Sequence, residues 1–137
     1  IPGFQLKLKN LDDSFIEGFK SCEMKRFVTS HAAFAYLAKK YALEMLAISG
    51  ISPDEEPNAR KIAEITDLVT EYGIKYVFAE TLLSSKITET IVAETGAQIL
   101  VLNPIEGLTN DEEKNGDDYF SIMQNNLKNL KTALSCQ

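Results

Sequence analysis

The sequence predicts an α/β fold, a four-stranded, mainly parallel sheet with helices on both faces. Three observations lead to this prediction. Four short apolar or β-branched runs alternate with helix-like segments along the chain, and parallel neighbours in a sheet need a crossover helix between them. A length of 137 residues suits one domain, and a hydrophobic content of 45% supplies a core for two or three layers. No internal repeat or low-complexity linker divides the chain.

The amino-terminal part opens without a strong pattern. The segment through Leu11 is expected to be irregular or extended. Residues 12–14 (Asp-Asp-Ser) then offer N-cap oxygens before the apolar positions Phe15 and Phe19, and this arrangement predicts a helix that runs to about Cys22.

Two strand–helix units follow. Residues 26–30 are apolar and β-branched and predict a strand, while the Ala-rich segment 32–41 places its apolar residues on one helical face. Residues 44–49 predict a second strand. After a polar loop with two prolines, residues 59–72 predict a helix that Gly73 stops.

The second half repeats the pattern and ends in a long helix. Residues 76–79 and 98–102 are continuous apolar runs, typical of buried strands, and residues 84–95 between them predict a helix ended by Gly96. After a polar stretch, residues 117–134 predict the last helix. Its buried stripe is expected to contain Tyr119, Ile122, Met123, Leu127, Leu130 and Leu134.

Polar side chains gather where the predicted strands end. In an open parallel sheet, ligands collect beyond the carboxyl ends of the strands. His31, the only histidine, follows the first strand, whereas Glu80 and Glu106 follow the third and the fourth. An imidazole nitrogen and an oxygen from Glu106 would suit zinc, and Glu80 could hold the imidazole in its orientation. The other polar residues at this rim are Ser52, Asp54, Glu55, Glu56 and Asn103.

The residues alone leave other roles open for two of these groups. His31 also fits a position at the start of a helix, hydrogen-bonded to a carbonyl oxygen. Glu80 equally fits a carboxylate that accepts hydrogen bonds from backbone N–H groups at a helix start. The acidic runs 54–56 and 111–113 are expected to be solvated, because neither has the alternating oxygen ligands and central glycine of a calcium loop.

Several classes of function are disfavoured. A net charge of −6 and a pI near 4.8 argue against binding nucleic acid, since counterion release requires a basic face. No run of about 18 apolar residues predicts a membrane span. No GxSxG, Walker A or GxGxxG motif occurs, and Ser30 beside His31 is not a catalytic triad because neighbours on a strand end point apart. The chain is therefore not expected to be an enzyme.

Cys22 and Cys136 stand near opposite ends of the chain. This spacing suits neither a thiolate metal site nor a redox CxxC pair, and it favours a disulfide worth about 4 to 5 kcal/mol in an oxidising compartment. Two unrelated buried thiols are the alternative. The chain begins at Ile1 without an initiator Met or a signal region, so a mature form or a fragment is expected.

Five motifs occur in family-like order: FVTSHAAFAY (27–36), ISGISPDEEP (48–57), FAETLLSSK (78–86), LNPIEG (102–107) and GDDYFSIM (116–123). Together they resemble the carboxy-terminal lobe of zinc ABC-transporter solute-binding proteins. The resemblance implies a two-lobed protein, joined by a long helix, that holds its metal between the lobes. Residues 1–24 would then be the lead-in and the end of the connecting region, and residues 25–137 the α/β core, with the amino-terminal lobe absent.

The resemblance also implies a site and a function. His31 matches the family's histidine ligand in this lobe, and Glu106 matches an acidic ligand that some zinc-binding members supply. Relatives that take manganese carry a carboxylate where this chain has His31, so zinc is favoured over manganese. The expected function is capture of zinc in the periplasm, or at the extracytoplasmic surface on an anchor, for an ABC permease. The missing lobe would supply the other donors that tetrahedral zinc requires.

Three alternatives remain at this stage. The chain could be a manganese-binding member of the same family. It could instead be a flavodoxin-like α/β enzyme or regulatory domain that holds a nucleotide or phosphate at the strand ends, although it lacks a glycine-rich loop. An adhesin-like role is a third reading, since surface binding proteins of this kind can meet host or envelope partners.

Overall fold

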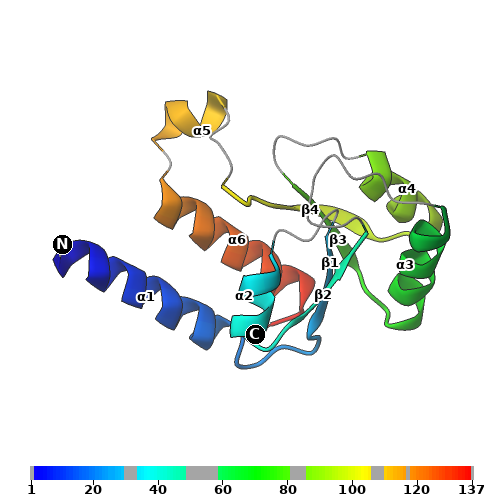
Figure 1. Ribbon diagram of the computed structural model, residues 1–137, viewed down its shortest axis with the longest axis horizontal. Helices are drawn as coiled ribbons and strands as arrows, with labels where there is room; N and C mark the ends of the chain where they lie inside the picture. Colours follow the sequence, from blue (N-terminus) through cyan, green and yellow to red (C-terminus); the bar gives the residue numbers. More distant parts are fainter. Residues whose placement is uncertain are drawn as a thin grey trace.

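The computed structural model describes residues 2–29, 34–48, 59–80, 86–105, 110–116 and 118–136. Strands and helices alternate from the first strand to the last, as Figure 1 shows, so the predicted α/β class is confirmed. The helices are α1 Pro2–Gly18, α2 Ala35–Lys40, α3 Ala59–Glu71, α4 Lys86–Thr95, α5 Asn110–Asn115 and α6 Tyr119–Ala133. The strands are β1 Arg26–Thr29, β2 Glu44–Ala47, β3 Tyr76–Glu80 and β4 Gln98–Leu102.

The four strands form one parallel sheet in the order β2-β1-β3-β4. In this register Thr29 of β1 lies opposite Phe78 of β3, and Glu80 of β3 lies opposite Leu102 of β4. The chain leaves β1 toward β2 on one side, whereas it leaves β3 toward β4 on the other. The connections therefore diverge between the two central strands, and this point is the topological switch of the sheet.

Helices cover both faces of the sheet, with α1, α2 and α6 on one face and α3 and α4 on the other (Figure 1). The pleat of the strands sorts their side chains between the two cores. Phe27 and Phe78 lie in the core under α1, α2 and α6, whereas their neighbours Val28 and Val77 lie in the core under α3 and α4. Burial on both faces explains why these strands have continuous apolar sequences.

The expectation of an irregular segment through Leu11 is wrong, because α1 covers residues 2–18. Leu11 and Phe15 are one helical turn apart, and both are buried in the core that includes α6. The carboxylate of Asp12 does not cap this helix. It lies within α1 and accepts a hydrogen bond of 2.7 Å from the Tyr41 hydroxyl. Tertiary packing against α6 thus stabilises a helix that the local sequence did not indicate.

A disulfide joins Cys22 to Cys136. The helix that was predicted to run to Cys22 ends at Gly18, so this cysteine lies in the connection to β1 and not in the helix. Beside the disulfide, the main-chain N–H of Met24 donates to the carbonyl oxygen of Leu134 at 3.0 Å. The connection after α1 is therefore attached, covalently and by hydrogen bonds, to the segment after α6.

The last helix is described from Tyr119, and its predicted start near residue 117 lies outside the described residues. Asp118 is its N-cap: the side-chain carboxylate accepts the N–H of Ser121, and the Ser121 hydroxyl accepts the N–H of Asp118, both at 2.9 Å. Tyr119 is 45% exposed, so its predicted place on the buried stripe is wrong. The short helix α5 was not predicted. The predicted helix starts at residues 32 and 84 also lie outside the described ranges.

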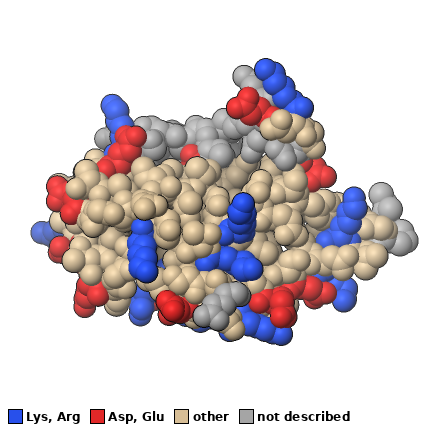
Figure 2. Space-filling model, turned by 180° about the vertical axis from the view of Figure 1, so that it is seen from behind, with Lys and Arg blue, Asp and Glu red and all other residues tan. Residues whose placement is uncertain are grey.

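Acidic and basic side chains are interspersed on the face shown in Figure 2, and neither sign forms a continuous field there. The pairs include Lys9 with Asp13, and Arg26 with Glu44, in which N–O distances are 3.4 and 2.8 Å. Among the helices of the described ranges, none has the length and apolarity that crossing a membrane would take.

Candidate metal centre

The carboxyl ends of β1 and β3 flank the topological switch of the sheet. This is the position where open α/β sheets bind ligands, because the loops diverge there and leave a crevice. Glu80 is the last residue of β3 and is only 4% exposed. A carboxylate is seldom buried to this extent unless a cation or hydrogen-bond donors stabilise its charge. The structure thus places one of the three predicted site residues at the switch.

The two predicted ligands, His31 and Glu106, lie outside the described residues, as do Ser52 and residues 54–56. The register of β1 and β3 is described up to the residues that precede His31 and Glu80. Thr29 is opposite Phe78, so His31 stands two residues after one member of this pair and Glu80 stands two residues after the other. The described register of these two strands ends at this pair.

The loop after β4 is the route by which the chain reaches Glu106. Its first residue, Asn103, is 5% exposed. The side-chain oxygen of Asn103 accepts the main-chain N–H of Ile105 at 2.8 Å, which is an Asx turn. Ile105 has a φ of 62°, in the left-handed region that a β-branched residue rarely adopts. The main chain just before Glu106 thus has a defined and unusual conformation.

Within the described ranges, no group of three or more His, Cys, Asp or Glu residues could hold a metal ion. The thiols of Cys22 and Cys136 are joined as a disulfide and cannot bind metal as thiolates. What these ranges supply is the carboxylate of Glu80 and a fixed main chain before Glu106. This part of the chain can support a metal site but does not complete one.

Sequence reasoning missed two asparagines of α6. Asn126 is 2% exposed, and its side chain bonds to the main chain of Asn103. Asn129 donates to the carbonyl oxygen of Val101 in β4 at 2.8 Å. The signal was available, because Asn126 stands one helical turn from Ile122 and from Leu130 on the predicted apolar stripe. A polar residue on a buried stripe needs a partner, and that partner is the loop after β4.

Comparison with known sequences gives a consistent family. The family model described as "ZnuA: Zinc-uptake complex component A periplasmic" matches residues 3–133. The "Zinc-binding protein AdcA" of Streptococcus pyogenes serotype M6 is 45% identical over 125 residues, which is 91% of this chain and 24% of the relative. The "High-affinity zinc uptake system protein ZnuA" of Bacillus subtilis is 41% identical over 128 residues, 93% of this chain and 40% of the relative. The chain thus spans less than half the length of these curated relatives.

Solved structures agree with the sequence matches. The Zn(II)-bound ZnuA-like domain of Streptococcus pneumoniae AdcA has a TM-score of 0.78 and 43% identity, and the match covers 97% of this chain and 50% of that one. The laminin-binding protein Lbp of Streptococcus pyogenes has a TM-score of 0.86 and 38% identity, with coverage of 97% and 51%. In both cases this chain corresponds to about half of the larger structure.

Proposed function

The chain belongs to the ZnuA family of zinc-uptake components, and on that premise we propose that it captures zinc outside the cytoplasm for delivery to an ABC importer. The observation that carries the proposal is the topological switch between β1 and β3. The only histidine of the chain follows one of these strands, and the buried Glu80 ends the other. Zinc is the substrate of the protein here, and the chain binds it without chemical change.

Two residues of this chain would contact zinc. His31 would supply an imidazole nitrogen and Glu106 a carboxylate oxygen, and both are donors that zinc accepts at about 2.0 to 2.2 Å. A nitrogen donor favours zinc over manganese, which prefers oxygen ligands. Zinc usually takes four donors, so two more must come from elsewhere. That requirement separates tight binding by the full-length protein from weak binding by this chain alone.

We infer that the remaining donors belong to an amino-terminal lobe of the same protein. This chain matches about half of each of the two solved relatives. It would form the carboxy-terminal lobe, with zinc held between the lobes and released to a permease when they separate. The pneumococcal AdcA is named a zinc-binding lipoprotein, which supports an extracytoplasmic location, where the disulfide between Cys22 and Cys136 persists.

Glu80 would act behind the ligands. Metal-bound histidines usually donate their second ring N–H to a carboxylate or carbonyl group, which fixes the ring and the tautomer. Glu80 is buried at the end of β3, and His31 follows the neighbouring strand β1 in the sequence, which supports this role. If so, Glu80→Gln should weaken zinc binding by about 10- to 100-fold. An effect on the free energy of unfolding alone would instead favour a carboxylate that caps a helix.

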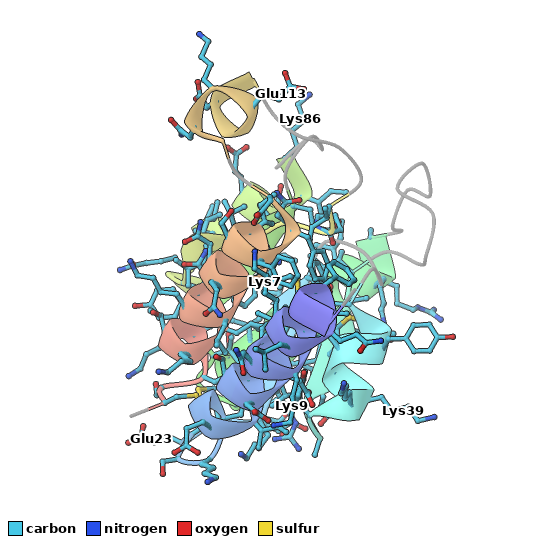
Figure 3. All side chains as sticks on the ribbon, turned by 90° about the vertical axis from the view of Figure 1, so that its left-hand side faces the viewer. Lys7, Lys9, Glu23, Lys39, Lys86 and Glu113 are labelled. Carbon is cyan, nitrogen blue, oxygen red and sulfur yellow. A yellow bond between two sulfur atoms is a disulfide. The ribbon has the colours of Figure 1, made fainter. Side chains whose placement is uncertain are left out.

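The deciding experiment is calorimetric zinc titration of the metal-free full-length protein and its variants. His31→Ala should weaken zinc binding by about 100-fold or more, exceeding the loss expected for an outer partner. Glu113→Ala is the matched control, because Glu113 is an exposed acid of α5. Figure 3 shows it at the same end of the molecule as Lys86, the first residue of the helix that follows β3. Unchanged zinc affinity in His31→Ala would contradict the proposal.

The same protein distinguishes the alternatives. A manganese-binding member would show tighter binding of Mn²⁺ than of Zn²⁺ in competition. A flavodoxin-like enzyme or regulatory domain would show a rise in melting temperature with a nucleotide and none with zinc, since only a ligand that binds the folded state stabilises it. The zinc-capture proposal predicts a rise with zinc alone.

A further inference from the structure

The free edge of β4 is bonded to α6 through asparagine side chains. Among the described strands β4 is the last in the sheet, so within this part of the chain the outward main-chain groups of its alternate residues have no neighbouring strand. Asn129 donates to the carbonyl oxygen of Val101 at 2.8 Å. Asn126 bonds to the main chain of Asn103, which lies two residues after Val101. The amides of α6 thus replace the strand that is absent from this edge.

Asn126 makes the more complete of the two contacts. Its side-chain oxygen accepts the N–H of Asn103 at 2.9 Å, and its side-chain nitrogen donates to the carbonyl oxygen of Asn103, also at 2.9 Å. One amide therefore satisfies both main-chain groups of one residue, as a paired strand would. Asn126 and Asn103 are 2% and 5% exposed, so water cannot readily take over these hydrogen bonds.

The contact fixes a short path to Glu106. Asn103 in turn restrains the main chain two residues further on, because its side-chain oxygen accepts the N–H of Ile105. Pro104 between them restricts φ to about −65°. Ile105 holds a left-handed φ of 62°, a conformation that persists only where the surroundings determine it. Glu106 is the next residue in the sequence.

We propose that Asn126 is a positioning residue for zinc binding: by clamping Asn103 it sets the direction in which the chain presents Glu106. The inference rests on the proposed function, in which Glu106 is a zinc ligand. Asn126 itself does not touch the metal. Because a ligand displaced by even 1 Å loses much of its bond to zinc, the clamp affects metal affinity as well as folding.

The test measures zinc affinity and the free energy of unfolding for the full-length protein, five single variants and one double variant. Asn126→Leu removes both hydrogen bonds at nearly constant volume and should weaken zinc binding by about 10-fold or more. Asn126→Asp keeps the acceptor but turns a buried carboxylate oxygen toward the carbonyl oxygen of Asn103, so it should also weaken zinc binding, and it serves as the second variant if the first fails to fold. Leu130→Ala is the control for lost stability, since Leu130 is fully buried one turn further along α6. Asn129→Ala is the control for the neighbouring edge contact. Both controls should retain the parent affinity.

The fifth variant, Glu106→Gln, identifies the route of the effect. In that background Asn126→Leu should cause little further loss of affinity, because a residue that acts through Glu106 cannot add to the loss of Glu106. If Glu106→Gln weakens zinc binding but Asn126→Leu and Asn126→Asp do not, the clamp serves folding alone and the inference is wrong. An additive double variant would also overturn it. If Glu106→Gln leaves zinc binding unchanged, the ligand assignment fails first, and the inference fails with it.

Discussion

Removing the disulfide between Cys22 and Cys136 should lower the free energy of unfolding of the 137-residue chain by about 5 kcal/mol. The bond joins residues that are 114 apart in the sequence. In the chain-entropy relation, closing a loop of that length costs the unfolded state about 4.8 kcal/mol at about 25 °C. A domain of this kind has about 5 to 15 kcal/mol of stability in total, so the loss is a large fraction of it.

The folded state should change little when the bond is lost. The N–H of Met24 still reaches the carbonyl oxygen of Leu134 at 3.0 Å, and the N–H of Glu23 reaches that of Ser135 at 3.3 Å. These hydrogen bonds hold the two segments together without the sulfur bridge. The predicted effect therefore belongs mainly to the unfolded chain, which becomes free to expand.

Urea denaturation of the oxidised chain and of the Cys22→Ser, Cys136→Ser double variant measures this difference. The midpoint should fall in the variant, and the denaturant slope should rise because more surface is exposed on unfolding. A reducing agent should move the parent toward the variant and leave the variant itself unchanged. A loss smaller than about 1 kcal/mol would refute the entropic reasoning.

Two further predictions concern a side-chain contact and a backbone conformation. Tyr41→Phe removes the 2.7 Å hydrogen bond to Asp12 and should cost about 1 kcal/mol in urea denaturation at neutral pH. The hydrogen bond from Tyr41, followed by that from Lys40, lowers the pKa of Asp12 below its usual 3.8. The folded state thus favours the carboxylate. Its contribution to the free energy of unfolding is complete above pH 3.8 and is lost as the pH falls through the lowered pKa. The parent and Tyr41→Phe should therefore differ less in acid than at neutral pH, and a constant difference would contradict this reading. Gly96→Ala should cost about 1 to 2 kcal/mol, measured as a fall in melting temperature, because φ is 78° at this position. The added Cβ would meet no heavy atom within 4 Å, so the cost comes from the backbone conformation and not from a clash. An unchanged melting temperature would contradict a left-handed backbone here.

The fold was predictable where one local signal agreed with burial. The strand predicted at 98–102 matches β4, and the glycines expected to stop two helices, Gly73 and Gly96, both have positive φ. The start of α1 was not predictable from its first residues, since Pro2 and Gly3 suggest an irregular segment. Proline is tolerated in the first turn of a helix, however, and the partners that stabilise α1 lie in α6, more than 100 residues later.

The candidate site was predictable only in part. The rule that ligands bind beyond parallel strands identified the rim from strand positions alone, and Glu80 stands there in the structure. His31 and Glu106 remain predictions, because they lie outside the described residues. The clamp by Asn126 could not be derived from local patterns, since it acts on a residue 23 positions away. A polar residue on an apolar stripe shows that a partner exists, but only the tertiary structure shows which one.

The described part of the chain has properties that half of a shared metal site would require. Its two cores cover both faces of the sheet, and a disulfide joins the connection after α1 to the segment after α6. In the proposed function, donors attached to such a scaffold would lose less conformational entropy on binding zinc. In the proposed mechanism, release of zinc consequently needs only the separation of this lobe from the other donors, and this lobe itself need not unfold. Zinc should therefore raise the melting temperature of the full-length protein much more than that of the 137-residue chain.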